Sequence, residues 1–307
     1  MTLGDYLAGA SRGHNGAPKP ALIVQGGGLR GIYSMSALAT LEELGLRDSF
    51  SFVIGSSAGA INGAYFLAGQ AREGVGIYVD DLSNRHFISP LRFWRIVDVD
   101  YMVDVALKQR HPLDIDAMLA APAPLYTVLT DAETAQAEVV SNRDPEIDIY
   151  EVFRATGALP VLYNRRVLVG DRRYVDGGIA EQVPLAEAIR RGASEALVIL
   201  TRGAGHRRVD RSPAYRAGAR LLSFGQSRAI RAKVGVADAA YNTAMETLEA
   251  ENGTHTSCTT WSLRPSDLQQ LVGRTTKDGA ALRACAELAR ADMLALLNGK
   301  HENVSSC

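Results

Sequence analysis

Two short apolar runs near the start of the chain each end in a glycine-rich turn that leads into a helical stretch. The first run, Ala21–Gln25, precedes Gly26–Gly31, and the second, Phe50–Ile54, precedes Gly55–Gly59. Continuous apolar runs of this length are typical of buried parallel strands. The helical stretch Ile32–Leu44 between them supplies the crossover that parallel strands need. This order predicts a right-handed βαβ unit, and therefore an α/β fold.

The second turn fits the G-x-S-x-G pattern of a nucleophile elbow, with Ser57 at its centre. A serine raised on a sharp strand-to-helix turn has strained backbone, so Gly55 and Gly59, two residues before and after it, must be small. Ser57 would also lie at a helix N-terminus, where the helix dipole favours a developing alkoxide. The same residues equally fit an ordinary small-residue turn in which Ser57 is a helix cap.

The first turn, Gly26–Gly31, satisfies the G-x-G-x-x-G spacing of dinucleotide-binding folds. That fingerprint requires an acidic residue about 20 positions on, at the end of the second strand, to hold the ribose. The nearest acid, Asp48, precedes that strand, which ends instead in the nucleophile pattern. The sequence therefore disfavours dinucleotide binding.

An oxyanion hole is the alternative use of this turn. Because glycines have no side chains to obstruct the approach, Gly26, Gly27 and Gly28 would present backbone N–H groups to an oxyanion formed at Ser57. Adjacent parallel strands place both turns at the same carboxyl edge of the sheet. Arg30 would add a positive charge facing an anionic substrate, or would lock the turn through a salt bridge.

The rest of the chain continues to alternate strands and helices, with no internal repeat or long linker. We expect one domain over residues 20–298, between a flexible N-terminus (1–19) and a C-terminal tail (299–307). The further predicted elements are the strand pairs Leu125–Thr130 with Ala137–Ser141 and Arg166–Gly170 with Arg173–Val175, the buried strand Glu195–Thr201, the mostly helical Pro213–Glu251 and the helix Asp278–Leu297.

Composition describes an ordinary globular chain. With 307 residues, 47% hydrophobic residues and a net charge of −1, nothing suggests a nucleic-acid partner. Three widely spaced cysteines give neither a metal pattern nor a disulfide framework. No signal-peptide core and no apolar run of about 20 residues is present. We expect a cytoplasmic protein that at most touches a membrane surface, and leave its oligomeric state open.

Arginines and aromatic residues alternate in Arg85–Arg95, which contains Phe87, Phe93 and Trp94. A peripheral membrane contact would use such a pattern, with rings at the level of the headgroups and arginines on phosphates. A loop packed by its own aromatic side chains is the interpretation that we favour.

The second strand pair ends at Asp176, which is followed by Gly177 and Gly178. In isolation, an acid between a strand and two glycines is best explained as an Asx turn. However, the two glycines let neighbouring backbone come close, which leaves the carboxylate free to point into a cleft.

Four blocks, taken in order, resemble the patatin-like phospholipase family, and most closely its bacterial single-domain members. They are Gly26–Gly31, Gly55–Gly59, Ala155–Pro160 and Asp176–Gly178. The one departure is Thr156, which stands where serine is usual, at a position that is not catalytic in the family. The resemblance implies a three-layer α/β fold with a mostly parallel central sheet flanked by helices.

The resemblance also implies the chemistry. Ser57 would be the nucleophile, Asp176 the general base and the backbone of Gly26–Gly28 the oxyanion hole, with no metal or cofactor. An aspartate of ordinary pKa, about 3.9, is a weak base at neutral pH, so Asp176 would have to be partly desolvated. The substrate would be a lipid ester, either a phospholipid or lysophospholipid, with acylglycerols as the alternative.

Two other hypotheses about the function remain open. An α/β-hydrolase triad would need a histidine after Ser57, and His206, His255 and His301 are available, although each is better explained as a lone surface histidine. A regulatory module that responds to nucleotide or phosphate would leave Ser57 idle, and the helical region after Arg207 would be its place.

Overall fold

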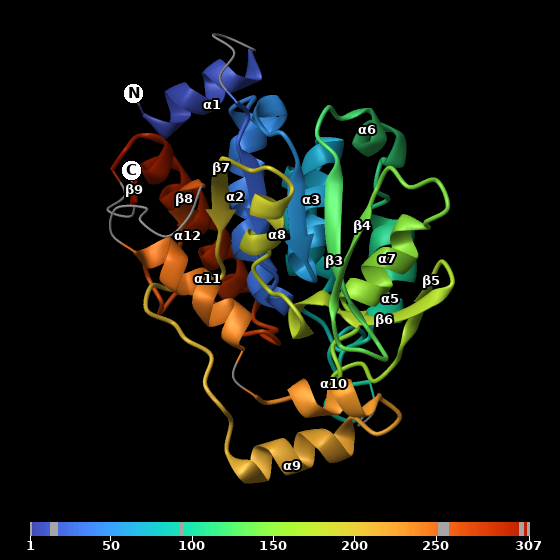
Figure 1. The fold of residues 1–307 in the computed structure, drawn as a ribbon. Coiled ribbons are helices and arrows are strands. Elements are labelled where there is room, and N and C mark those ends of the chain that lie inside the picture. Colours follow the sequence, from blue (N-terminus) through green and yellow to red (C-terminus); the bar gives the residue numbers. More distant parts are fainter. Residues whose placement is uncertain are drawn as a thin grey trace.

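The computed structural model describes residues 2–12, 18–92, 95–236, 238–250, 258–300 and 304–305. Its strands form one nine-stranded sheet in the order β5-β6-β3-β2-β1-β7-β8-β9, with β4 also paired to β3 (Figure 1). The strands are β1 (Ala21–Val24), β2 (Val53–Ser56), β3 (Leu125–Asp131), β4 (Ala137–Ser141), β5 (Val167–Val169), β6 (Arg172–Asp176), β7 (Glu195–Ile199), β8 (Thr259–Leu263) and β9 (Val304–Ser305).

The five central strands, β3, β2, β1, β7 and β8, are parallel, whereas the outer pairs β3–β4, β3–β6, β5–β6 and β8–β9 are antiparallel. The registers Leu22↔Val53 and Val24↔Gly55 align β1 with β2. The turns that follow these two strands therefore meet at one carboxyl edge of the sheet. The predicted α/β fold is confirmed, with antiparallel strands at its edges.

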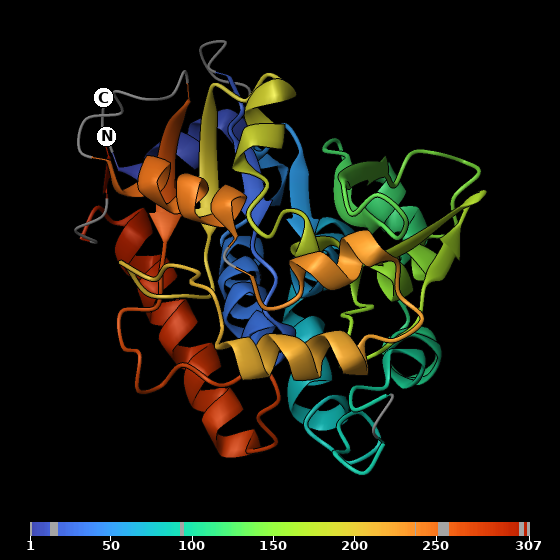
Figure 2. The ribbon, with the colours of Figure 1, turned by 60° about the horizontal axis from the view of Figure 1, so that its bottom comes forward.

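Helices cover both faces of the sheet (Figure 2). Helices α2, α3 and α12 contribute to one apolar core, and α8 and α11 pack against the other face. The helices are α1 (Leu3–Ser11), α2 (Gly31–Glu43), α3 (Ala58–Ala68), α4 (Ala71–Gly76), α5 (Val99–Tyr101), α6 (Ile115–Ala120), α7 (Ile149–Thr156), α8 (Leu185–Arg190), α9 (Pro213–Leu222), α10 (Arg228–Lys233), α11 (Ala239–Glu249) and α12 (Gly279–Leu297), with π-helical segments η4 (Ile77–Asp81) and η5 (Met102–Arg110).

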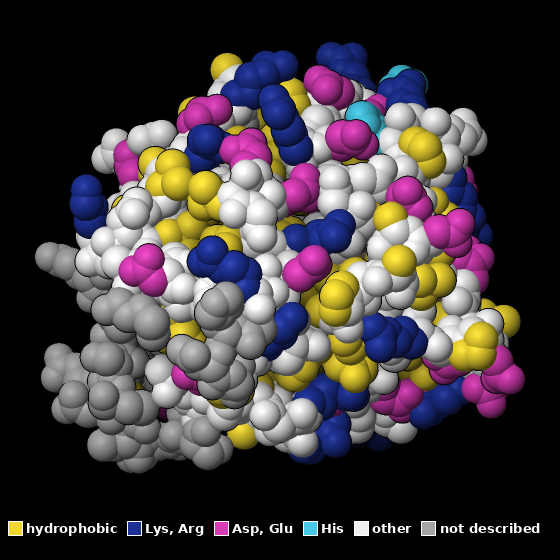
Figure 3. All heavy atoms as spheres, turned by 90° about the horizontal axis from the view of Figure 1, so that it is seen from above, with side chains coloured by type: hydrophobic (Ala, Val, Ile, Leu, Met, Phe, Trp, Pro, Cys, Tyr) yellow, Lys and Arg dark blue, Asp and Glu magenta, His cyan; other side chains and the backbone are white. Residues whose placement is uncertain are grey.

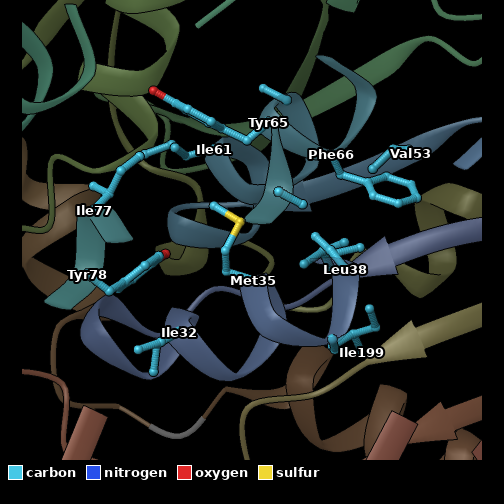
Figure 4. Close-up of a cluster of buried hydrophobic side chains, with 14 of the residues drawn as sticks. Ile32, Met35, Leu38, Val53, Ile61, Tyr65, Phe66, Ile77, Tyr78 and Ile199 are labelled. Carbon is cyan, nitrogen blue, oxygen red and sulfur yellow. The ribbon is translucent and has the colours of Figure 1, made fainter. Parts of the chain in front are cut away.

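Helix α2 is buried along its whole length from Gly31 to Leu41, because it is apolar on every side. Figure 4 shows Met35 on this helix among Ile61, Tyr78 and other side chains of the larger core. The hydroxyl groups of its two serines and of Thr40 donate to backbone carbonyls, as Ser36 Oγ does to Ala286 O at 2.6 Å. This packing fixes the helix that begins directly after the glycine-rich turn.

The chain begins differently from the flexible N-terminus that we expected. Residues Leu3–Ser11 form α1, and its Leu3 and Leu7 are buried against the core. Thr2 and Asp5 form a capping box at its start. No described helix is long and apolar enough to cross a membrane.

Candidate active site

Ser57 occupies a strained turn between β2 and α3. Its φ of 53° and ψ of −133° lie in a region that costs a non-glycine residue about 1–3 kcal/mol. The flanking glycines have no room for a side chain. A Cβ at Gly55 would lie 2.7 Å from the Gly59 carbonyl carbon, and one at Gly59 would lie 2.2 Å from Val24 O. This is the steric arrangement that the G-x-S-x-G spacing predicts.

Thr156, at the end of α7, holds the strained turn in place. The Ser57 N–H donates to Thr156 Oγ1 at 2.8 Å, and the Thr156 hydroxyl donates in turn to Val128 O at 2.9 Å. The sequence alone shows Thr156 only as a departure from the usual serine. Its hydroxyl is the group that serine and threonine share, which explains why either residue fits here.

Thr156→Val should therefore weaken the protein and its activity, because it leaves the Ser57 N–H and Val128 O without their partner. We expect a loss of about 1–3 kcal/mol in the free energy of unfolding and a lower kcat. Thr156→Ser keeps the hydroxyl and should retain both. Thermal melting and ester hydrolysis measure the two effects, and equal behaviour of the valine and serine variants would contradict this role.

The Ser57 and Asp176 side chains meet directly. Ser57 Oγ donates to Asp176 Oδ2 at 2.9 Å, and the Gly178 N–H donates to Asp176 Oδ1 at 2.7 Å. Asp176 ends β6, two strands from β2, and the backbone of Gly177 passes close to β3. A Cβ at Gly177 would lie 2.1 Å from Val128 O. The glycines thus allow the close approach that brings this carboxylate to the serine.

Burial raises the pKa of Asp176 to about 6. The hydrogen bonds from Ser57 and Gly178, and the positive charges of Arg274 and Arg208, oppose that shift. The carboxylate is only 4% exposed. At neutral pH it is therefore mostly ionised, and it is a stronger base than an exposed aspartate.

This pKa predicts the pH dependence of hydrolysis. If ionised Asp176 is the base, kcat/KM for an uncharged short-chain ester should fall about tenfold per pH unit below about pH 6 and level off above it. Arg274→Gln removes a nearby cation, so it should move the midpoint to higher pH. A profile that stays flat from about pH 5 to 8 would contradict the assignment of Asp176 as the base.

Hydrogen bonds to the carbonyl group of Gly26 hold the glycine-rich turn in place. Gly26 O accepts hydrogen bonds from Thr201 Oγ1 at 2.9 Å and from Gln182 Nε2 at 3.2 Å. In a trans peptide the next N–H, that of Gly27, points the opposite way. The N–H groups of Gly27 and Gly28 have no hydrogen-bond partner within the described part of the chain. They are therefore available to a ligand in the cavity, which both glycines line.

Six arginines line this cavity, and Arg30 lies close enough to three of the others, Arg202, Arg208 and Arg274, to feel their charge. Arg30 is 5% exposed and its Nε has no hydrogen-bond partner. No described carboxylate forms an ion pair with it, so the salt bridge that we considered is not observed. Burial and the other three arginines lower the pKa of Arg30, although a guanidinium stays charged at neutral pH.

The other members of this cluster are also short of counter-charges. Among the described residues, neither Arg202 nor Arg274 has an ion pair, and Arg208 pairs with Asp238 at 3.4 Å. Bringing guanidinium groups together out of water is unfavourable unless an anion joins them. Arginine is also the side chain best suited to hold a phosphate or carboxylate. The cluster was not predicted, because its members are scattered over the sequence.

The cavity has a volume of about 1010 Å³, and Ser57 and Asp176 line it. Besides the arginines, it is lined by apolar side chains from the segment between α3 and α7, including Ile77, Phe87 and Met102. It therefore combines an apolar lining with a positively charged one. A molecule with an acyl chain and an anionic group has the matching chemistry.

Of the three histidines considered for a triad with Ser57, the structure describes His206 alone. His206 is half-buried and lines the cavity, so it is not the lone surface histidine that we expected. Burial and neighbouring arginines lower its pKa. Within the described residues, no histidine hydrogen-bonds to Ser57 or Asp176. His255 and His301 lie outside the described residues.

The arginine-aromatic run packs mainly as a loop. Phe87 and Ile88 are buried, Arg92 pairs with Asp98 at 2.8 Å, and Arg95 pairs with Asp100 at 2.7 Å. The described part of the run thus packs as a loop, in agreement with the interpretation that we favoured. Phe93 and Trp94 lie outside the described residues.

Residues 22–189 match the family described as Patatin-like phospholipase, so the chain belongs to that family. It is 30% identical over 193 residues to the uncharacterized protein YjjU of Escherichia coli K12, an alignment that covers 59% of this chain and 51% of YjjU. The chain thus spans about half the length of this curated relative. Its fold is similar to that of VipD from Legionella pneumophila, with a TM-score of 0.54 and 16% identity over 92% of this chain and 68% of VipD.

Proposed function

We propose that this protein is a serine acyl hydrolase that cleaves carboxylic ester bonds of phospholipids or lysophospholipids. The observation that carries the proposal is the 2.9 Å hydrogen bond from Ser57 Oγ to Asp176 Oδ2, on the wall of a cavity lined by the glycine-rich turn. Membership of the patatin-like phospholipase family supports it.

In the proposed reaction, Asp176 accepts the Ser57 proton while Oγ attacks the ester carbonyl carbon. The protonated carboxyl group then gives this proton to the departing alcohol, which leaves an acyl-enzyme. Water attacks the acyl-enzyme with Asp176 again as the base, which releases the fatty acid and restores Ser57. The free N–H groups of Gly27 and Gly28, beside Gly26, would stabilise the oxyanion in both halves of the reaction.

The cavity lining supports a lipid substrate with a phosphate. The apolar side chains suit an acyl chain, and Arg30, Arg202 and Arg274 would bind the phosphate. An acylglycerol would bury its acyl chain equally well, but it would leave these arginines without an anion. This difference is the basis for placing phospholipids ahead of acylglycerols.

A pair of substrates with one acyl chain in common tests this preference. We expect hydrolysis of a lysophospholipid to exceed that of the matching monoacylglycerol, and Arg202→Gln to lower kcat/KM for the lysophospholipid about tenfold. The monoacylglycerol has no phosphate to lose, so its kcat/KM should change little. The control is Arg190→Gln, because Arg190 is an exposed arginine that pairs with Glu187 and does not line the cavity. An equal loss on both substrates would contradict phosphate binding by the arginines.

A further inference from the structure

We propose that α9, α10 and the loop between them form a docking surface for an anionic lipid bilayer, at the entrance to the active-site cavity. The segment from Arg207 to Lys233 contains eight arginine or lysine residues and one acidic residue, Asp210. Its net charge is +7, in a chain whose total is −1. The rest of the chain is therefore acidic, and the basic charge is concentrated in this one segment.

Helix α9 is amphipathic, but its apolar side is not packed against the core. At about 100° per residue, Tyr215, Leu221 and Leu222 fall on one side of the helix, and Arg216 and Arg220 fall on the other. Ala219 is the one described residue of α9 that is buried. Tyr215 is 55% exposed, Leu221 72%, and Phe224, just beyond the helix, 65%. A cluster of large exposed apolar side chains of this kind marks an interaction surface.

Polar contacts with backbone carbonyls hold the segment in position. Arg231 Nε donates to Arg220 O at 3.2 Å, which joins α10 to α9. Asn164 Nδ2 donates to Phe224 O at 2.6 Å, and Arg166 Nε donates to Gly225 O at 3.0 Å. Because these bonds use the backbone of α9 and its loop, they leave the apolar side chains free to meet a partner.

Several arginines of the segment have no carboxylate paired with them among the described residues. Arg207, Arg208 and Arg216 pair with Glu249, Asp238 and Asp210, respectively. In contrast, Arg220, Arg228 and Arg231 form no ion pair with any described residue. Exposed leucine and phenylalanine beside unpaired arginines are the features by which helices bind in the interface of anionic membranes.

The proposed docking surface adjoins the active-site cavity. Tyr215 of α9 and Val234, just after α10, line the cavity together with Ser57. Figure 2 shows α9 and α10 lying side by side across the end of the molecule that was lowest in Figure 1. The face at the opposite end, seen in Figure 3, carries acidic and basic side chains interspersed. Docking through α9 and α10 would thus bring lipid to the cavity entrance.

An anionic bilayer fits this surface better than other occupants. A second copy docked through the same segment would place two charges of +7 against each other. A nucleic acid would match the charge, but it would leave Leu221, Leu222 and Phe224 without apolar contact. The choice of lipid rather than an acidic protein rests on the proposed lipolytic function.

Vesicle co-sedimentation of the full chain tests the proposal, with Ser57→Ala used throughout so that no lipid is hydrolysed. We expect binding to phosphatidylcholine vesicles with about one third phosphatidylglycerol, and at least tenfold weaker binding to phosphatidylcholine alone or at high salt. Leu221→Ser with Phe224→Ser, and separately Arg220→Gln with Arg228→Gln and Arg231→Gln, should each weaken binding at least tenfold. Thermal melting identifies any variant that fails to fold.

The control variants carry the same kinds of substitution outside the proposed docking surface. Leu44→Ser removes another exposed leucine, just after α2, and Arg12→Gln with Arg72→Gln and Arg290→Gln removes three arginines in or next to other helices. These variants should bind anionic vesicles as the parent does. Equal loss in the control and surface variants would overturn the proposal.

The remaining outcomes separate docking from catalysis. If the chain with Ser57 intact cleaves a soluble ester but the parent binds no vesicles, docking is overturned and the proposed function stands. If the chain cleaves no ester but the parent binds anionic vesicles through α9 and α10, docking is supported and the proposed function fails. Dimerisation in place of vesicle binding, measured by light scattering and abolished by the Leu221→Ser and Phe224→Ser changes, would overturn docking in favour of a second copy.

Discussion

Replacing Ser57 with alanine is expected to lower kcat/KM for a short-chain nitrophenyl ester by at least about 10⁴-fold. The reason is that Ser57 Oγ is the atom placed to attack, on a turn whose backbone is strained to present it. Alanine keeps the Cβ and removes only the hydroxyl, so the fold should remain intact. Steady-state hydrolysis and thermal melting of the same preparation measure both effects.

The neighbouring Ser56 is the matched control for this change. Its buried hydroxyl donates to Gln182 O at 3.0 Å and does not reach Asp176. Ser56→Ala should cost about 1 kcal/mol of stability and leave most of the activity. If Ser57→Ala were to keep activity, or if Ser56→Ala lost as much of it, the nucleophile would be misassigned.

Asp176→Asn should lower kcat/KM by a similar factor, because an amide of the same shape cannot accept the Ser57 proton. The Asn side-chain oxygen can still accept the hydrogen bond from the Gly178 N–H, so the loop should keep its position. Since the two residues act as a unit, the double variant Ser57→Ala with Asp176→Asn should be no slower than either single variant. Additive losses would mean that they act independently.

Asp131 provides the control for the aspartate. It is also a buried carboxylate, but it accepts bonds from Thr134 and pairs with Arg172 at 2.7 Å. Asp131→Asn should lower the melting temperature and leave the activity of the folded protein nearly unchanged. A loss of activity comparable to that of Asp176→Asn would indicate that the Asp176 effect is structural.

The parts of the fold that depend on local pattern were predicted from the sequence. The βαβ unit from Ala21 to Ser57 follows from apolar runs and glycine-rich turns, and the strand pairs β3–β4 and β5–β6 follow from short connections. The order of strands across the sheet was not predicted, because it depends on contacts between distant segments. Helix α1 was missed, although Thr2 and Asp5 carry the spacing of a capping box that would have indicated it.

The residues of the candidate site were likewise predicted only in part. Sequence motifs and the family resemblance named Ser57, Asp176 and the glycine-rich turn, which the structure brings together. The contact of Thr156 with the Ser57 N–H and the gathering of arginines around Arg30 need the folded chain, because their partners are far away in the sequence. The same is true of His206, whose place in the cavity no motif indicated.

Labelling with a fluorophosphonate probe tests the central claim most directly, because the probe reacts only with an activated serine. Peptide mass spectrometry would locate the label in the unsubstituted chain and in the Ser57→Ala, Asp176→Asn and His206→Ala variants. We predict a label on Ser57 that His206→Ala keeps and that both Ser57→Ala and Asp176→Asn lose. An unlabelled wild type, or a label that disappears in His206→Ala and persists in Asp176→Asn, would contradict a serine activated by Asp176.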